Sequence, residues 1–228
     1  MLEIPYTTCS HLAATLTFNK FACNRFLDSF DIPVAKAVLV RKSAAINSSA
    51  IIEKVGLPCF VKPADGGSSY GITKVENESE LENAITLALK HGTQALIESF
   101  LKGREVTNGI YKSLRGIHVL PITEILTEND FFDFDAKYKG ESNEITPADL
   151  EAEMTAKIKG LTLKVYEILD LTGITRADYI IHNGEPHLIE INAVPGQSAE
   201  SIIPKMAAHE GVSLKQLFED VLEVALKG

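Results

Sequence analysis

The stretch Arg176-Ala177-Asp178, followed by Leu188-Ile189-Glu190-Ile191-Asn192, carries the most information in this chain. Two short apolar runs hold Asp178, Glu190 and Asn192, and residues 180–185 between them read as a β-hairpin. Mg²⁺ prefers carboxylate and other hard oxygen ligands and the phosphates that it bridges. Three oxygen donors beside one arginine therefore predict a site for activating a phosphorylated substrate.

The loop of this hairpin decides whether the polar side chains share one face. Side chains alternate along a strand, so Arg176 shares a face with Asp178, and Glu190 with Asn192. A two-residue Asn183-Gly184 turn puts the two pairs on opposite faces, whereas a three-residue loop or a β-bulge brings them together. We therefore expect a three-residue loop or a bulge. A surface hairpin with a few charges is the alternative reading of the same spacing.

Length, composition and charge exclude several classes of protein. The 228 residues suffice for one large domain or two modest ones, and 45% hydrophobic with 23% charged residues is ordinary for a globular protein. A net charge of −9 argues against a nucleic-acid surface, which needs a basic face. An acidic chain still binds ATP if its lysines and arginines are concentrated in one cleft.

The cysteines and the amino-terminal residues indicate the compartment. Cys9, Cys23 and Cys59 are odd in number and lack the spacing of a zinc site, so a reduced cytosol is expected rather than a disulfide framework. Residues 1–6 have no basic segment followed by an apolar one, as a signal peptide would, and no apolar run is long enough to span a bilayer. We expect a cytoplasmic protein with no membrane partner.

The order of helical and extended patterns predicts an α+β fold. The predicted helices cover 11–30, 46–55, 79–90, 148–170, 201–209 and 213–227, and Ser79 is expected to cap the third of them. The predicted strands cover 38–40, 58–63, 72–75 and 94–98, with a strand-rich region at 104–126. The polar stretch 127–148 is long enough to suggest a functional loop. This order fits two α+β lobes, residues 1–104 and 105–228, with a cleft between them.

A loop rich in glycine and serine, Asp65–Gly71, lies between two predicted strands. Backbone N–H groups without Cβ crowding approach phosphate oxygens closely, and serine hydroxyls add donors, although most such loops are ordinary turns. The loop matches neither the P-loop nor the dinucleotide-binding pattern. Lys62 precedes it at a strand end and Lys20 lies on the first helix, so each either delivers a charge to a phosphate or is a solvated lysine.

Two further groups of residues suit a nucleotide. Glu98 ends an apolar strand, and an edge strand with exposed backbone there would suit adenine, with Glu105 placed for ribose hydroxyls. Solvated carboxylates are the alternative for both. Lys137-Tyr138 lies in the suspected loop, where Phe131, Phe132 and Phe134 either close over a ligand or pin the loop to its own lobe. No histidine or cysteine has an activating partner, so a side-chain nucleophile is not indicated.

Together these residues resemble the ATP-grasp ligases, and specifically the D-alanine–D-alanine ligases. The likeness covers essentially the whole chain in the same order. Its motifs are Ile4-Pro5-Tyr6-Thr7, Phe18-Asn19-Lys20, Phe60-Val61-Lys62-Pro63, Gly67–Gly71, Leu96-Ile97-Glu98, Gly103–Thr107, Asp135-Ala136-Lys137-Tyr138, Arg176-Ala177-Asp178, Glu190–Gly196 and Ser201-Ile202-Ile203-Pro204.

The resemblance implies an ATP-grasp fold whose two lobes clasp ATP, and it implies a role for each candidate residue. The ATP-binding set would be Lys20, Lys62, Ser69, Glu98, Phe100, Leu101, Glu105 and Lys137, with Lys137 reaching the γ-phosphate. Two Mg²⁺ ions, or Mn²⁺ in their place, would be bound by Asp178, Glu190 and Asn192. Arg176 and the Gly196 backbone would stabilise the tetrahedral oxyanion of the reaction. Ser68 and Tyr138 would help to place the first D-alanine and the loop 127–148, which would act as a lid. Ser201 would contact the carboxylate of the second D-alanine.

The implied reaction is phosphorylation of one D-alanine by ATP, followed by attack of a second D-alanine amine on the acyl phosphate, for peptidoglycan synthesis. Relatives commonly form dimers, which implies a homodimer. They also carry an additional amino-terminal domain, and this chain is expected to represent the ATP-grasp portion. Residues 197–200 are Gln-Ser-Ala-Glu, whereas many relatives have a histidine just before the matching serine, so Glu200 is expected to alter the second-substrate pocket. The alternatives are a nucleotide-binding module without turnover and a ligase for D-lactate or another D-amino acid.

Overall fold

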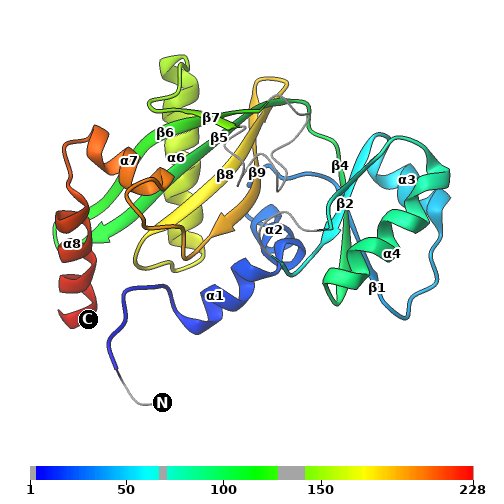
Figure 1. The fold of residues 1–228 in the computed structure, drawn as a ribbon, viewed down its shortest axis with the longest axis horizontal. Coiled ribbons are helices and arrows are strands. Elements are labelled where there is room, and N and C mark those ends of the chain that lie inside the picture. Colours follow the sequence, from blue (N-terminus) through cyan, green and yellow to red (C-terminus); the bar gives the residue numbers. More distant parts are fainter. Residues whose placement is uncertain (1–3, 67–70, 128–141, 228) are drawn as a thin grey trace.

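The computed structural model describes residues 4–66, 71–127 and 142–227, which form two antiparallel sheets with helices around them (Figure 1). The smaller sheet has the strand order β1-β4-β2-β3. Its strands are β1 (Ala37–Arg41), β2 (Cys59–Pro63), β3 (Thr73–Val75) and β4 (Gln94–Ser99). The helices α3 (Ser48–Val55) and α4 (Leu81–His91) cover one face, with the short 3₁₀ helix η1 (Glu78–Glu80) leading into α4.

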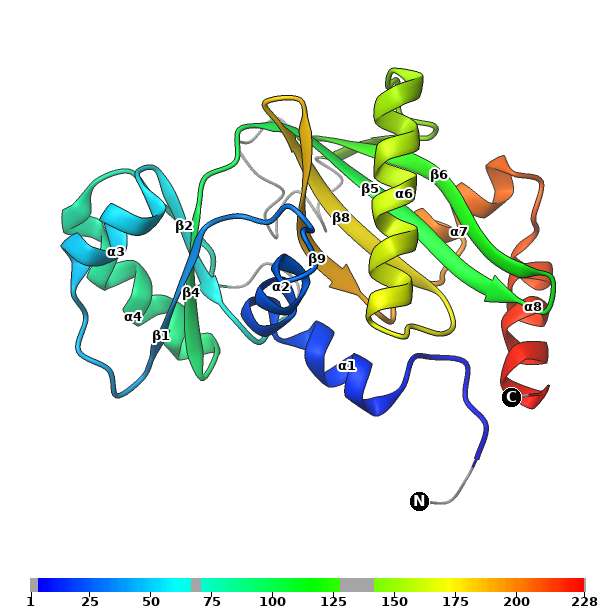
Figure 2. The ribbon, with the colours of Figure 1, turned by 180° about the vertical axis from the view of Figure 1, so that it is seen from behind.

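The larger sheet has the order β7-β6-β5-β8-β9 and lies beside the smaller one (Figure 1). Its strands are β5 (Gly103–Ser113), β6 (Gly116–Thr127), β7 (Ser142–Ile145), β8 (Thr175–His182) and β9 (Glu185–Asn192). The long helix α6 (Ala152–Ile168) packs on one face, as the reverse view shows (Figure 2). The helices α7 (Ile202–His209) and α8 (Leu214–Lys227) pack against β5 and β6 around a separate core. The predicted α+β class is confirmed.

The predicted helix 11–30 is two helices, α1 (His11–Phe18) and α2 (Lys20–Asp28). The break occurs at Asn19, whose backbone is extended (φ −92°, ψ 100°). Its side-chain oxygen accepts a hydrogen bond from the Ala22 amide at 2.9 Å, which is the geometry of a helix N-cap. Asn19 therefore ends one helix and starts the next, and the chain turns at that point.

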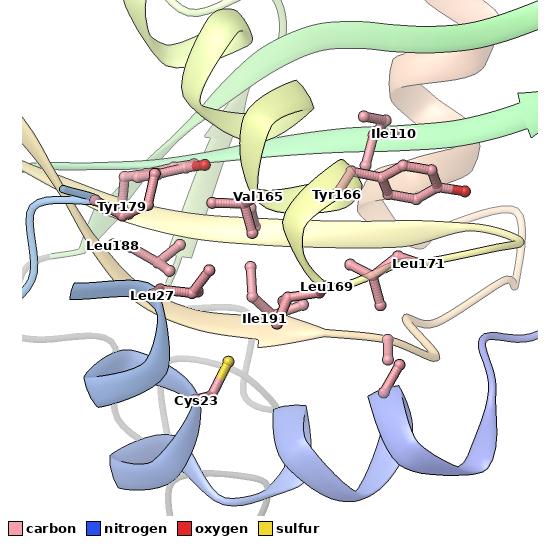
Figure 3. Packing of buried hydrophobic residues seen from close by; sticks show 14 of the residues in the cluster. Cys23, Leu27, Ile110, Val165, Tyr166, Leu169, Leu171, Tyr179, Leu188 and Ile191 are labelled. Atoms are coloured by element: carbon pink, nitrogen blue, oxygen red, sulfur yellow. The ribbon is translucent and has the colours of Figure 1, made fainter. Parts of the chain in front are cut away.

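The helices α1 and α2 share the core of the larger sheet although they come from the start of the chain. Cys23 and Leu27 of α2 lie against Leu188 and Ile191 of β9, with Val165 of α6 closing the core from above (Figure 3). The amide of Leu188 also donates to the Pro33 carbonyl at 2.8 Å. The lobe division at residue 104 stays a prediction, with β5 beginning at Gly103.

Three local expectations were wrong. Asn77, not Ser79, caps the region before α4, through a capping box with Glu80. Part of the stretch 127–148 is a strand, because β7 pairs with β6. The strand that carries Glu98 is not an edge, because β4 lies between β1 and β2. Within the described ranges, no helix is long and apolar enough to cross a membrane.

Candidate functional site

The site is a cavity of about 820 Å³ between the two sheets, and side-chain alternation builds it. On β8, Ala177 and Tyr179 point into the core beneath α6, so Arg176 and Asp178 point to the opposite face and line the cavity. On β2, Val61 packs toward the core under α3 and α4, while Lys62 lines the cavity. The face of each sheet that α6, α3 and α4 leave uncovered therefore forms a wall of the site.

The β8–β9 hairpin brings its polar residues to one face through a bulge. Asn183 and Gly184 form a two-residue turn with positive φ angles of 51° and 79°. Tyr179 pairs with Leu188, but Asp178 pairs with Glu190, so Ile189 is an extra residue in β9. The predicted bulge is confirmed, and it occurs together with the two-residue turn.

The carboxylate of Asp178 accepts four short hydrogen bonds. Arg176 donates from Nε at 2.8 Å and from Nη2 at 2.9 Å, Asn192 donates from Nδ2 at 2.9 Å, and Thr107 donates from Oγ1 at 2.5 Å. Burial of Arg176 on its own lowers its pKa, but the adjacent Asp178 carboxylate outweighs this and raises the pKa. Arg176 is therefore a permanent cation, held in a fixed orientation.

Lys20 joins α2 to the larger sheet. Its Nζ lies 3.2 Å from Glu190 Oε2 and donates to the Gly66 carbonyl at 2.6 Å. Gly66 is the second residue of the glycine- and serine-rich loop Asp65–Gly71. Lys20 thus places a positive charge between the carboxylates of the hairpin and the start of that loop.

Lys62 and Glu98 form an ion pair in the smaller sheet, with 2.5 Å between Nζ and Oε2. Both residues are buried, at 8% and 6% exposure, so neither is the solvated surface residue of the alternative reading. Burial lowers the pKa of Lys62, but Glu98 and, at longer range, Glu190 and Glu105 outweigh it and raise the pKa. The ammonium therefore stays charged inside the cavity wall.

The donor set at the hairpin suits a hard divalent cation. Asn192 Nδ2 lies 2.9 Å from Asp178 Oδ2 and 3.5 Å from Glu190 Oε1, so the three side chains converge. A half-turn of the Asn192 amide would present its oxygen beside the two carboxylates, giving only oxygen donors, as Mg²⁺ prefers. Among the described residues no group of three or more His, Cys, Asp or Glu is arranged to bind a metal. The predicted set is two carboxylates and one amide, and it fits Mg²⁺.

Gly196 and Ser201 also line the cavity. Ser201 immediately precedes α7, and its Oγ lies 2.9 Å from Ser198 Oγ. A Cβ atom added to Gly196 would lie 2.8 Å from Ser201 Oγ. The absence of a side chain at Gly196 therefore leaves room for this hydroxyl beside the backbone.

Most of the predicted site residues that the structure describes line this one cavity. They are Lys20, Lys62, Glu98, Leu101, Glu105, Arg176, Asp178, Glu190, Asn192, Gly196 and Ser201. Phe100 is not among the described lining residues, and its ring contacts Phe60 with 5.7 Å between centroids. The predictions for Ser68, Ser69, Lys137 and Tyr138, and those for Phe131, Phe132 and Phe134, lie outside the described residues.

Sequence reasoning missed Thr107, Ile180 and Glu144, which also line the cavity. The alternation of side chains along a strand could have identified Thr107 and Ile180. Thr107 follows Glu105 by two residues on β5, and Ile180 follows Asp178 by two on β8, so each shares a face with a candidate. Glu144 lies on β7, in the stretch expected to be a loop.

Residues 26–223 match the protein family described as D-ala D-ala ligase C-terminus. This chain belongs to the D-alanine–D-alanine ligase family. It is 42% identical over 224 residues to the D-alanine–D-alanine ligase of Bacteroides fragilis and 44% identical to that of Phocaeicola vulgatus. In both cases the match covers 98% of this chain and 69% of the relative.

Solved structures of the same ligase family have the same fold. The VanG D-Ala:D-Ser ligase from Enterococcus faecalis superposes with a TM-score of 0.85 at 30% identity, covering 96% of this chain and 64% of that one. The D-alanine–D-alanine ligase from Bacillus anthracis complexed with ATP gives 0.86 at 25% identity, covering 99% and 72%. The predicted family and the ATP-grasp fold are confirmed, and the chain spans about 69% of the length of its curated relatives.

Proposed function

We propose that this chain uses ATP to join two D-alanine molecules through an acyl phosphate, in the synthesis of peptidoglycan. The convergence of Lys20, Lys62 and Arg176 with Asp178 and Glu190 in one cavity carries this proposal. Family membership and the ATP complex of the Bacillus anthracis relative support it. The chain carries a net charge of −9, so the three cations gathered in one cavity would supply the local positive charge that a nucleotide needs.

In the proposed complex, ATP lies between the two sheets. Lys20 and Lys62 neutralise phosphate oxygens, each exchanging part of its contact with Glu190 or Glu98 for the nucleotide. Residues Ser99 and Leu101, where the chain leaves β4, line the cavity and are proposed to meet adenine, with Glu105 on the ribose. Bound Mg²⁺ would supply charge neutralisation between the phosphates and the carboxylates of Asp178 and Glu190.

The reaction needs positioning and charge neutralisation rather than a protein nucleophile. A carboxylate oxygen of the first D-alanine attacks the γ-phosphorus, and ADP leaves. The amine of the second D-alanine then attacks the acyl carbon, and phosphate leaves. Arg176 donates to the oxyanion that forms at this carbon, together with the Gly196 amide. Ser201 and the first turn of α7 hold the carboxylate of the second substrate.

Several predictions about this chain remain to be tested. Ser68, Ser69, Lys137 and Tyr138 are proposed to act as the family resemblance implies. A cytoplasmic location is proposed because Cys9, Cys23 and Cys59 are all free thiols and the cosubstrate is ATP. A homodimer and the absence of a nucleic-acid partner are proposed on the family resemblance and the acidic charge.

The test is release of ADP in the presence and absence of D-alanine, with D-serine and D-lactate as alternative acceptors. We expect ADP release that depends on D-alanine and on Mg²⁺, with the dipeptide as product. ADP release only with D-serine or D-lactate would keep the fold and change the acceptor. ATP binding without acceptor-dependent ADP release would contradict the proposal and leave a nucleotide-binding module.

A further inference from the structure

The bulge in β9 depends on contacts from outside the sheet. An extra residue in one strand leaves its backbone without a ladder partner. Here that residue is Ile189, and its carbonyl accepts a hydrogen bond from Asn24 Nδ2 of α2 at 3.0 Å. Its neighbour Leu188 also forms a hydrogen bond outside the sheet, because its amide donates to the Pro33 carbonyl at 2.8 Å. The chain around the end of α2 thus supplies the contacts that the bulge lacks.

Asn24 is built into this position. The residue is 2% exposed, and among the described atoms its Oδ1 has no hydrogen-bond partner, so its side chain is held in the described part of the chain by the bond to Ile189. Burying an amide is unfavourable unless it forms a hydrogen bond, so an apolar residue would suit this core position better on packing grounds alone. The cost of burying Asn24 is offset by a bond to one specific backbone carbonyl.

That carbonyl belongs to the extra residue that shifts the register of the hairpin. Without the extra residue, the two-residue turn would pair Asp178 with Ile189 and turn Glu190 to the opposite face, because a one-residue shift reverses every side chain. Asn24 lies one helical turn after Lys20, and Lys20 contacts the Glu190 carboxylate at 3.2 Å. One face of α2 therefore holds both the bulge and the side chain that the bulge redirects.

We propose that Asn24 is a positioning residue that fixes the Ile189 bulge and thereby holds Glu190 opposite Asp178 in the cation- and ATP-binding site. Asn24 is not among the described residues that line the cavity, so it acts through the backbone of β9. The inference rests on the proposed function of Glu190 for its effect on binding, but its structural half stands independently of any ligand.

The experiment compares Asn24→Leu and Asn24→Asp with Cys23→Ala. Leucine keeps similar volume without the amide, and aspartate keeps the shape but puts an acceptor against a carbonyl. Cys23 is the preceding residue of α2, is also 2% exposed and packs in the same core through apolar contacts, so its variant controls for damage to this helix. Global stability of each variant is measured by urea unfolding, so that local effects are compared after correction for it.

The first readout is hydrogen–deuterium exchange over residues 186–192 without metal or nucleotide. We expect exchange there to rise about tenfold in both Asn24 variants beyond the change in global stability, and to follow global stability in Cys23→Ala. The second readout is Mn²⁺ affinity by electron paramagnetic resonance, for which we expect a loss of about tenfold, as for outer-sphere metal partners.

The two readouts separate the inference from the proposed function. If exchange over 186–192 in the Asn24 variants follows global stability alone, the positioning role is overturned. If exchange rises as expected but the unsubstituted chain does not bind Mn²⁺, the metal site of the proposed function fails while the role of Asn24 in the bulge stands. Faster exchange with unchanged Mn²⁺ affinity would overturn the link from Asn24 to Glu190.

Discussion

Lys62 and Glu98 form a buried ion pair on the neighbouring strands β2 and β4, with 2.5 Å between Nζ and Oε2. Removing one partner of such a pair leaves an uncompensated charge in the protein interior, which costs about 3–5 kcal/mol. We therefore expect Lys62→Met to lower the free energy of unfolding by this amount and to weaken ATP binding. Urea unfolding and nucleotide titration of the same preparations measure the two effects.

The double variant Lys62→Met with Glu98→Gln separates stability from binding. Removing the stranded carboxylate should restore most of the lost stability, whereas ATP affinity should stay low because the ammonium is still absent. If the double variant regains both, Lys62 has only a structural role in the sheet.

Glu190→Gln should weaken Mg²⁺-dependent activity far more than it affects folding. The Lys20–Glu190 contact is partly exposed, at 15% and 21% for the side chains, so its loss should cost less than about 1 kcal/mol. The Mg²⁺ requirement should rise by at least about 100-fold, because losing a direct ligand should cost no less than losing an outer-sphere partner. Activity against Mg²⁺ concentration gives this value.

Glu185→Gln is the matched control for this prediction. Glu185 lies on the same strand at the exposed tip of the hairpin, where it pairs with Lys157 away from the cavity. It should leave both the Mg²⁺ requirement and stability nearly unchanged. Equal losses of activity and stability in Glu190→Gln would make Glu190 a structural residue.

Gly196→Ala should impair the second substrate. The added Cβ would lie 2.8 Å from Ser201 Oγ and 3.4 Å from Ser201 Cβ, so the serine must move. We expect the KM of the second D-alanine to rise about tenfold, which corresponds to about 1.4 kcal/mol, with ATP affinity retained. Steady-state kinetics at saturating ATP tests this.

Gly160→Ala makes the same chemical change where there is room. Gly160 lies within α6, and an added Cβ meets nothing within 4 Å. This variant should keep normal kinetics and gain about 0.5–1 kcal/mol of stability, because glycine is unfavourable in a helix. Unaltered D-alanine kinetics in Gly196→Ala would show that Ser201 does not contact the substrate.

Stability should fall as the pH rises above 9. Burial raises the pKa of the Cys23 thiol to about 12 from an ordinary 9.0, and that of Cys59 to about 11. Between pH 9 and the raised pKa of each thiol, the unfolded chain loses a proton that the folded chain keeps, so raising the pH favours unfolding. The contribution is fully present below pH 9 and is lost as the pH rises toward the folded pKa.

Cys23→Ala isolates one thiol in this pH dependence. Its unfolding free energy should fall less steeply between pH 9 and 11, by up to about 1.4 kcal/mol per pH unit. Urea unfolding at pH 8, 9, 10 and 11 gives the slopes. Identical slopes for the two proteins would mean that the Cys23 thiol is not protected from ionisation by the fold.

The parts of the fold that follow from local pattern could be predicted from sequence. The bulge was inferred because Arg176, Asp178, Glu190 and Asn192 must share a face to have a common role, and strand alternation with the Asn183-Gly184 turn forbids this without an extra residue. The break at Asn19 had a local signal as well, since asparagine is a preferred N-cap. The apolar pattern continues on both sides of Asn19, however, and this pattern favours one continuous helix.

The parts that depend on distant pairing could not be predicted. Nothing near Glu98 shows that β1 flanks its strand on one side and β2 on the other, so the strand was read as an edge. For the same reason, neither the sequence around Lys62 nor the sequence around Glu98 indicates that these two side chains are buried against each other. The packing of α2 on β9 likewise joins segments whose apolar patterns are each compatible with many partners.

The shared core of α2 and β9 has a consequence for how the nascent chain folds. The ribosome makes α1 and α2 before the two sheets, but Leu188 and Ile191, against which Leu27 packs, emerge only after the whole smaller sheet and α6. At about 5–20 residues per second, the apolar side of this helix pair waits for many seconds before its partner exists. The smaller sheet can close during translation, whereas the core that α2 shares with β9 is completed only after β9 has been made.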